Sequence, residues 1–136
     1  MALTFEYEKN HSTILGEIRR PVARVSFYSQ PKDKWYDILM IVDTGADYTL
    51  LPKYFADQLG INLKKECKVF KTSGVGGTRK VFFLERVKVT LGPWERVIPI
   101  GFLDQDTIPP LLGRHLFLET FKIVFSPDHT VTFSSK

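Results

Sequence analysis

A short apolar run that ends in one carboxylate constrains this chain more than any other stretch. Residues 38–42 are all apolar, which predicts a strand buried on both faces, and they lead directly into Asp43-Thr44-Gly45. A charged group at the end of such a strand is costly unless it is paired or used. Gly45 permits a sharp turn that brings backbone N–H groups towards the carboxylate. The sequence therefore marks Asp43 as a candidate functional residue, with a plain turn after a strand as the alternative.

Length and charge limit the classes of protein to which the chain can belong. At 136 residues it is expected to form a single domain, residues 1–136, with a core over about residues 20–126. The formal charge is +4, but the Lys and Arg residues are scattered rather than gathered into the stripe that nucleic-acid binding requires. We therefore expect no nucleic-acid partner. Cys67 is the only cysteine, which excludes an intrachain disulfide and a cysteine-based zinc site.

The first residues and the apolar runs predict where the protein resides. Residues 1–9 have neither a basic start nor the apolar segment of a secretory signal. The longest strongly apolar run is far shorter than the roughly 20 residues that a membrane-spanning helix needs. These observations predict a cytoplasmic protein without a membrane partner.

Alternating apolar and polar residues predict a strand-rich chain. At its start, Leu3, Phe5 and Tyr7 alternate with polar residues, which is the period of a half-buried strand. The same pattern, interrupted by turn residues, continues to the end of the sequence. Strands are expected over residues 3–7, 12–18, 22–28, 35–42, 67–72, 79–91, 94–103, 122–126 and 130–133.

One or two short helices are expected between these strands. Residues 52–59 begin with a proline and are followed by Gly60, the arrangement typical of a helix start and a helix end. A second short helix is expected over residues 115–121, with Leu116 and Phe117 facing inward.

A glycine cluster separates two of the expected strands. Gly74-Val75-Gly76-Gly77 lies between residues 67–72 and 79–91, which predicts an extended hairpin with a glycine-rich tip. A phosphate-binding loop is a poor alternative, because the cluster lacks the Gly-Lys-Ser/Thr of a P-loop and a strand rather than a helix follows it. A hairpin turn without function is the other alternative.

The remaining polar residues suggest no second site. Asp104 and Asp106 are not followed by Thr-Gly or Ser-Gly, so a solvated acidic loop is the preferred interpretation. His11, His115 and His129 stand far apart in unlike contexts, which does not suggest a metal site or a Ser-His-Asp triad. We expect no metal and no cofactor.

Three segments in order resemble the retropepsin-like aspartic proteases. They are Asp43-Thr44-Gly45-Ala46-Asp47, the glycine cluster at residues 74–77, and Leu111-Leu112-Gly113-Arg114. Arg20-Pro21, ahead of the first core strand, also resembles the retroviral members. The similarity covers about residues 20–125. Because both ends of the chain differ from the retroviral pattern, a stand-alone cellular or bacterial relative fits better than a viral enzyme.

The resemblance implies a role for each matched residue. Asp43 would be the catalytic aspartate, supported by Gly45 and by Thr44, whose hydroxyl would lock two active-site loops together. Binding of a peptide is implied for Gly45, Ala46, Asp47, Gly74, Val75, Gly76 and Gly77, of which the last four would form a flap. Structural support is implied for Leu111, Leu112, Gly113 and Arg114. Arg114 would hold Asp47 or a nearby loop by charge-assisted hydrogen bonds.

The resemblance also implies a fold and an activity. The expected fold is all-β and mostly antiparallel, a closed, retropepsin-like acid-protease β-barrel half with a flap hairpin and one or two short helices. The expected activity is that of an aspartic endopeptidase, a hydrolase in which a homodimer acts on a peptide or protein substrate. One Asp43 per subunit would complete the catalytic dyad, because the chain contains a single Asp-Thr-Gly. The alternative is a non-catalytic peptide-binding or dimerisation module on the same fold.

Overall fold

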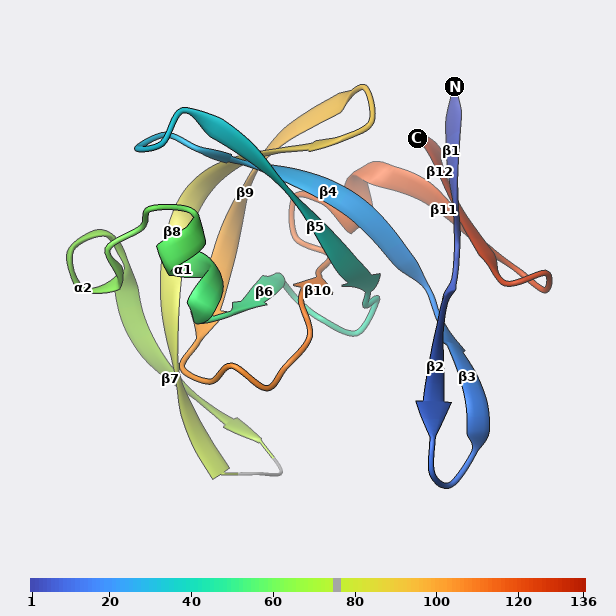
Figure 1. Cartoon of the computed structure of the whole chain (residues 1–136). Coiled ribbons are helices and arrows are strands. Elements are labelled where there is room, and N and C mark those ends of the chain that lie inside the picture. The colour runs from blue at the N-terminus through green and yellow to red at the C-terminus, as the bar shows by residue number, and fades with distance from the viewer. Residues whose placement is uncertain (75–76) are drawn as a thin grey trace.

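The computed structural model describes residues 1–74 and 77–136, and within them the chain is mostly β, as the sequence predicted (Figure 1). Two short α-helices, α1 (Tyr54–Gln58) and α2 (Leu63–Glu66), and a 3-10 turn at Leu118–Thr120 interrupt the strands. The strands are β1 (Ala2–Glu6), β2 (Glu8–Ser12), β3 (Gly16–Arg20), β4 (Val22–Ser29), β5 (Lys34–Val42), β6 (Thr49–Pro52), β7 (Lys68–Gly74), β8 (Gly77–Leu91), β9 (Trp94–Leu103), β10 (Leu111–Leu112), β11 (Phe121–Ser126) and β12 (Thr130–Ser135).

The central sheet closes on itself as a ring. Its strands follow the order β4-β5-β10-β6-β9-β8-β7, and β4 also pairs with β8. The closing contact aligns Ser26 with Thr90 and Phe27 with Val89. Only β10 with β5 and β6 with β9 pair in parallel in this sheet. The closed, mostly antiparallel fold expected from the sequence is therefore confirmed, and β7 and β8 continue beyond the ring as a long hairpin (Figure 1).

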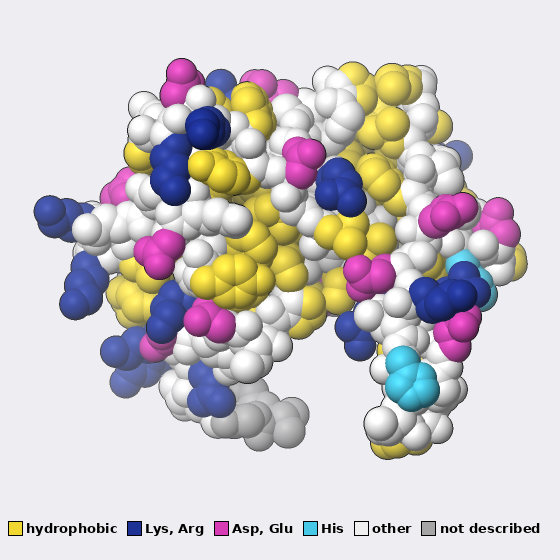
Figure 2. All heavy atoms as spheres, viewed as in Figure 1, with side chains coloured by type: hydrophobic (Ala, Val, Ile, Leu, Met, Phe, Trp, Pro, Cys, Tyr) yellow, Lys and Arg dark blue, Asp and Glu magenta, His cyan; other side chains and the backbone are white. Residues whose placement is uncertain are grey.

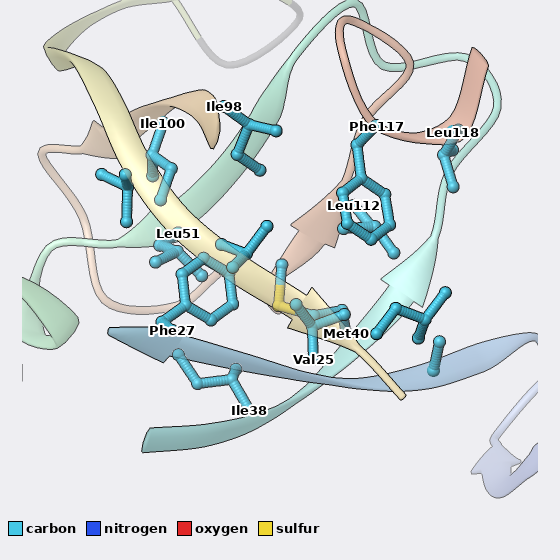
Figure 3. Close-up of a cluster of buried hydrophobic side chains, with 14 of the residues drawn as sticks. Val25, Phe27, Ile38, Met40, Leu51, Ile98, Ile100, Leu112, Phe117 and Leu118 are labelled. Carbon is cyan, nitrogen blue, oxygen red and sulfur yellow. The ribbon is translucent and has the colours of Figure 1, made fainter. Parts of the chain in front are cut away.

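The hydrophobic core fills the ring because successive residues of a strand point to opposite faces. In β4, for example, Val25 and Phe27 are fully buried, while Arg24, the residue before Val25, is exposed. Figure 3 shows that buried side chains from five strands and from the segment before β11 point towards one another. They include Val25, Phe27, Ile38, Met40, Leu51, Ile98, Ile100, Leu112, Phe117 and Leu118.

A second sheet brings the first and last strands together in the order β1-β12-β11. Phe133 of β12 packs edge-on against Phe5 and Phe121, with ring centroids 6.0 and 5.8 Å away. Phe121 in turn contacts Trp94 of the central sheet at 5.2 Å. The same core cluster includes Val131 and Phe133, so the two sheets share one hydrophobic interior.

The β2–β3 hairpin forms a separate two-stranded sheet. It corrects the expectation of one strand over residues 12–18, because the chain turns at residues 13–15 instead. The Ser12 hydroxyl accepts hydrogen bonds from the backbone N–H groups of Ile14 and Leu15, and Gly16 takes the positive φ of 76° that the turn needs.

The segment before β11 also differs from expectation, because residues 114–117 form a turn and only Leu118–Thr120 forms a 3-10 helix. Leu116 has a positive φ of 58°, which no right-handed helix allows, and its side chain is exposed rather than inward. Phe117 is fully buried, as predicted. The helix expected over residues 52–59 is present as the shorter α1, and Pro52 ends β6 instead of starting the helix. Within the described ranges, no helix has the length and apolar character needed to cross a membrane.

Candidate active site

Asp43 lies in a tight turn at the end of β5. Its backbone N–H donates to the carbonyl oxygen of Leu112 at 3.1 Å, which continues the parallel pairing of β5 with β10. Its side-chain Oδ1 accepts a hydrogen bond from the backbone N–H of Gly45 at 3.0 Å. The turn closes with a 3.1 Å bond from the N–H of Ala46 to the carbonyl of Asp43. The carboxylate is thus held by backbone groups while its residue stays partly exposed.

Gly45 and Thr44 present an open surface beside this carboxylate. Both are exposed, and a Cβ at position 45 would lie only 3.3 Å from Oδ1 of Asp43. That distance is tight for a methyl group, so glycine suits the close approach. Among the described residues, the Thr44 hydroxyl has no hydrogen-bond partner. The surface next to Asp43 therefore carries a free hydroxyl and bare backbone.

Gly113 packs directly against the chain that leaves the Asp43 turn. A Cβ at this position would lie 2.2 Å from the backbone carbonyl carbon of Tyr48, a distance no real contact allows. The N–H of Gly113 donates to the hydroxyl of buried Thr49 at 3.1 Å. Because Leu112 also bonds to Asp43, the position of β10 determines where the carboxylate sits. Leu112 is fully buried and Leu111 half-buried behind the turn.

The Thr49 hydroxyl gives a first testable prediction. Thr49→Val keeps the shape but removes the acceptor, leaving the Gly113 N–H unpaired, so we expect the free energy of unfolding to fall by about 1–3 kcal/mol. Thr49→Ser keeps the acceptor and should retain the hydrogen bond. Urea unfolding of both variants measures the difference, and equal losses in the two variants would contradict the role given to this hydroxyl.

Arg114, which follows β10, contacts both ends of the loop at residues 44–47. Its Nη1 donates to the carbonyl of Thr44 at 2.6 Å, and its Nη2 donates to the carboxylate of Asp47. Its backbone N–H bonds to the carbonyl of Ala46 at 3.0 Å. The contact with Asp47 that the sequence suggested is therefore present. The Asp47 side chain is largely exposed, so this ion pair adds little to the free energy of unfolding. Its main effect is to fix the conformation of the loop.

Tyr48 connects the loop at residues 43–47 with the long hairpin, and nothing in the sequence marked it. Its ring packs edge-on against Phe83 of β8 at 5.8 Å and against Phe70 of β7 at 6.4 Å. It also covers Gly101, where a Cβ would lie 2.7 Å from Cε2 of the ring. Burial, followed by the charge of Asp47, raises the pKa of the Tyr48 phenol. A cavity of about 320 Å³ adjoins this cluster.

The hairpin itself matches the sequence-based expectation along its described length. β7 and β8 pair without interruption from Lys68 opposite Phe83 to Gly74 opposite Gly77. Val75 and Gly76, which were expected at the tip, lie outside the described residues. The structure thus brings residues 43–47 together with residues 111–114. It places Gly74 and Gly77 opposite each other at the far end of the hairpin whose Phe83 contacts Tyr48.

The other carboxylates that the sequence raised have structural partners. Asp104 pairs with Lys53 at 3.2 Å, and Asp106 accepts a hydrogen bond from the backbone N–H of Tyr54 at 3.0 Å, next to the start of α1. Nδ1 of His115 lies 3.9 Å from Oε1 of Glu119. The part of the chain that the structure describes contains no group of three His, Cys, Asp or Glu side chains suited to a metal ion.

Comparison with known proteins identifies the class. Residues 33–116, more than half of the chain, match the family described as aspartyl protease, so the chain belongs to that family. The matched range includes the Asp43 turn, the long hairpin and Arg114.

A solved structure shows the same fold. It is the crystal structure of a retropepsin-like aspartic protease from Rickettsia conorii, with 20% sequence identity and a TM-score of 0.68 over 95% of this chain and 97% of that chain. The chain therefore has a retropepsin-like fold. No curated protein matches the sequence.

Proposed function

We propose that the chain is an aspartic endopeptidase that works as a two-fold homodimer with one Asp43 from each copy. The observation that carries the proposal is the single Asp-Thr-Gly turn, whose carboxylate stands beside exposed Thr44 and Gly45 instead of a second carboxylate loop. One turn supplies half of a dyad. An isologous dimer is the simplest way to complete it, because the same surface then meets itself across the axis.

The chemistry follows from two carboxylates held about 3 Å apart, which cannot both ionise and therefore share one proton. The charged Asp43 takes a proton from a water molecule, and the water oxygen attacks the scissile carbonyl carbon. The protonated Asp43 donates to the carbonyl oxygen, which gives a neutral tetrahedral intermediate. Its collapse breaks the C–N bond while a proton passes to the leaving nitrogen. The pair titrates as one unit.

The proposed substrate is an extended peptide held between the catalytic loop and the long hairpin. Gly45, Ala46 and Asp47 would line the cleft on one side, and residues 74–77 would cover the peptide as a flap. An extended peptide can pair with exposed backbone in such a cleft, and closing it excludes bulk water. The fixed loop geometry supports this arrangement, because Arg114 and Gly113 hold residues 44–48 in place.

The deciding experiment is a peptidase assay that measures cleavage with and without an inhibitor and over a range of enzyme concentrations. We expect cleavage of an unfolded protein substrate at acid pH, inhibition by a statine-type compound, and specific activity that falls as the enzyme is diluted below its dimer dissociation constant. Inhibitor binding without cleavage would favour a non-catalytic peptide-binding module. Specific activity that stays constant over a dilution in which sedimentation shows monomers would contradict the shared dyad.

A further inference from the structure

We propose that the β2–β3 hairpin, residues 8–20, is an arm that grips the second copy in the active dimer. This inference rests on the proposed function, because it takes the dimer as given and names one surface that holds it. For brevity, the hairpin is called the arm below.

The arm has little contact with its own chain. It forms a two-stranded sheet by itself, and none of residues 8–20 is buried. Two apolar residues stand at its tip, Ile14 with 89% and Leu15 with 74% of the residue's surface exposed. A lone two-stranded hairpin is marginally stable in water. An arm with an apolar tip and little packing in its own copy is suited to contact with another chain.

The root of the arm adjoins the catalytic carboxylate. Directly after β3, the carbonyl of Pro21 accepts a hydrogen bond from the N–H of Val42, the residue before Asp43, at 2.9 Å. Val22 then pairs with Ile41. Figure 1 shows the arm extending from this point, on the side of the molecule opposite the β7–β8 hairpin. Figure 2 shows both as separate projections with an open gap between them.

This placement puts a partner within reach of the arm. Two Asp43 carboxylates about 3 Å apart bring the roots of both arms close to the two-fold axis. A five-residue strand such as β3 extends about 17 Å. An arm of that length, rooted beside the axis, reaches the surface of the other copy.

The surface area that a stable dimer must bury indicates that the arm contacts a second copy of the chain rather than a substrate peptide. A stable interface buries about 800 Å² on each partner. The exposed part of the catalytic turn, mainly Thr44 and Gly45, is too small to supply it. β1 and β12 pair with each other within one copy. The arm is the extended, unpacked element next to the axis.

The test compares two double variants by sedimentation equilibrium and by activity against enzyme concentration. Ile14→Ser/Leu15→Ser should raise the dimer dissociation constant at least tenfold, lower specific activity in dilute solution, and restore it at high concentration. Val124→Ser/Phe125→Ser is the matched control, because these side chains are similarly apolar and about 40% exposed on the edge strand β11. It should dimerise like the wild type. Circular dichroism melting of both variants checks the fold.

Each other outcome overturns the inference in a distinguishable way. A wild-type dimer that the arm variant leaves unchanged rejects the arm and leaves the proposed function standing. A raised KM with unchanged dimerisation assigns the arm to substrate binding instead. Weakened dimerisation in the β11 control alone moves the interface to that edge. A wild type that stays monomeric at every concentration rejects the shared dyad as well.

Discussion

Asp43→Asn should lower kcat/KM by about three orders of magnitude or more, because each copy then lacks the carboxylate that activates water and protonates the carbonyl. The fold should be spared, since an asparagine oxygen can still accept the hydrogen bond from Gly45 N–H. Peptidase kinetics, with the melting temperature measured alongside, test this expectation. A variant that cleaves at the wild-type rate would end the assignment of Asp43.

Asp106→Asn is the matched control, because this carboxylate was one of the two others that the sequence raised. An asparagine there can still accept from the Tyr54 N–H, so activity should stay close to that of the wild type. Mixing adds a sharper test of the shared dyad. Excess Asp43→Asn protein should suppress wild-type activity by trapping active chains in mixed dimers. Activity that is unaffected by a tenfold excess of the variant would argue against a dyad built from two copies.

Gly113→Ala should be the most damaging substitution for the fold. The new methyl group would lie 2.2 Å from the carbonyl carbon and 2.3 Å from the carbonyl oxygen of Tyr48, and backbone atoms cannot turn aside as a flexible side chain can. We expect a loss of about 3 kcal/mol or more in the free energy of unfolding, which lowers Tm by about 10 °C. Activity should fall too, because displacing β10 moves the Leu112 carbonyl that bonds to Asp43.

Gly16→Ala separates this steric clash from the general cost of losing a glycine. Position 16 has a positive φ of 76°, but a Cβ there would meet nothing within 4 Å. Only backbone strain of about 1–2 kcal/mol is expected. Thermal melting of both variants makes the comparison. A Gly113→Ala protein no less stable than the Gly16→Ala protein would show that β10 yields more easily than the structure indicates.

Local patterns predicted strands β4 and β5 and the turn at Asp43, because each is encoded in contiguous residues and the two strands need only the turn between them to pair. The alternation in β4 shows which of its faces is buried. The apolar run in β5 was misleading on this point: the strand is buried on one face rather than on both, with Leu39 exposed on the other, because the fold covers only the inner face of the ring. The order of the three matched segments then indicated the family, which the match over residues 33–116 confirmed.

What the sequence missed depends on contacts or on single side-chain hydrogen bonds. The β2–β3 turn carries the apolar Ile14 and Leu15, so it resembled a strand, and Ser12 gave the only cue. Helix α2 is capped by Asn62, whose side chain accepts from Lys65 N–H, a signal present in the sequence but not used. The contact of Tyr48 with residues far along the chain has no local signature.

The aromatic contact between the loop and the hairpin has a mechanical consequence. Phe70 and Phe83 pack edge-on against the Tyr48 ring, while Gly101 lies close to that ring and Gly113 close to the Tyr48 backbone. If β7 and β8 tilt relative to the closed sheet, either Tyr48 separates from Phe70 and Phe83 or Tyr48 moves with them. A peptide that shifts the hairpin as it enters would therefore transmit that strain to the turn holding Asp43, five residues away.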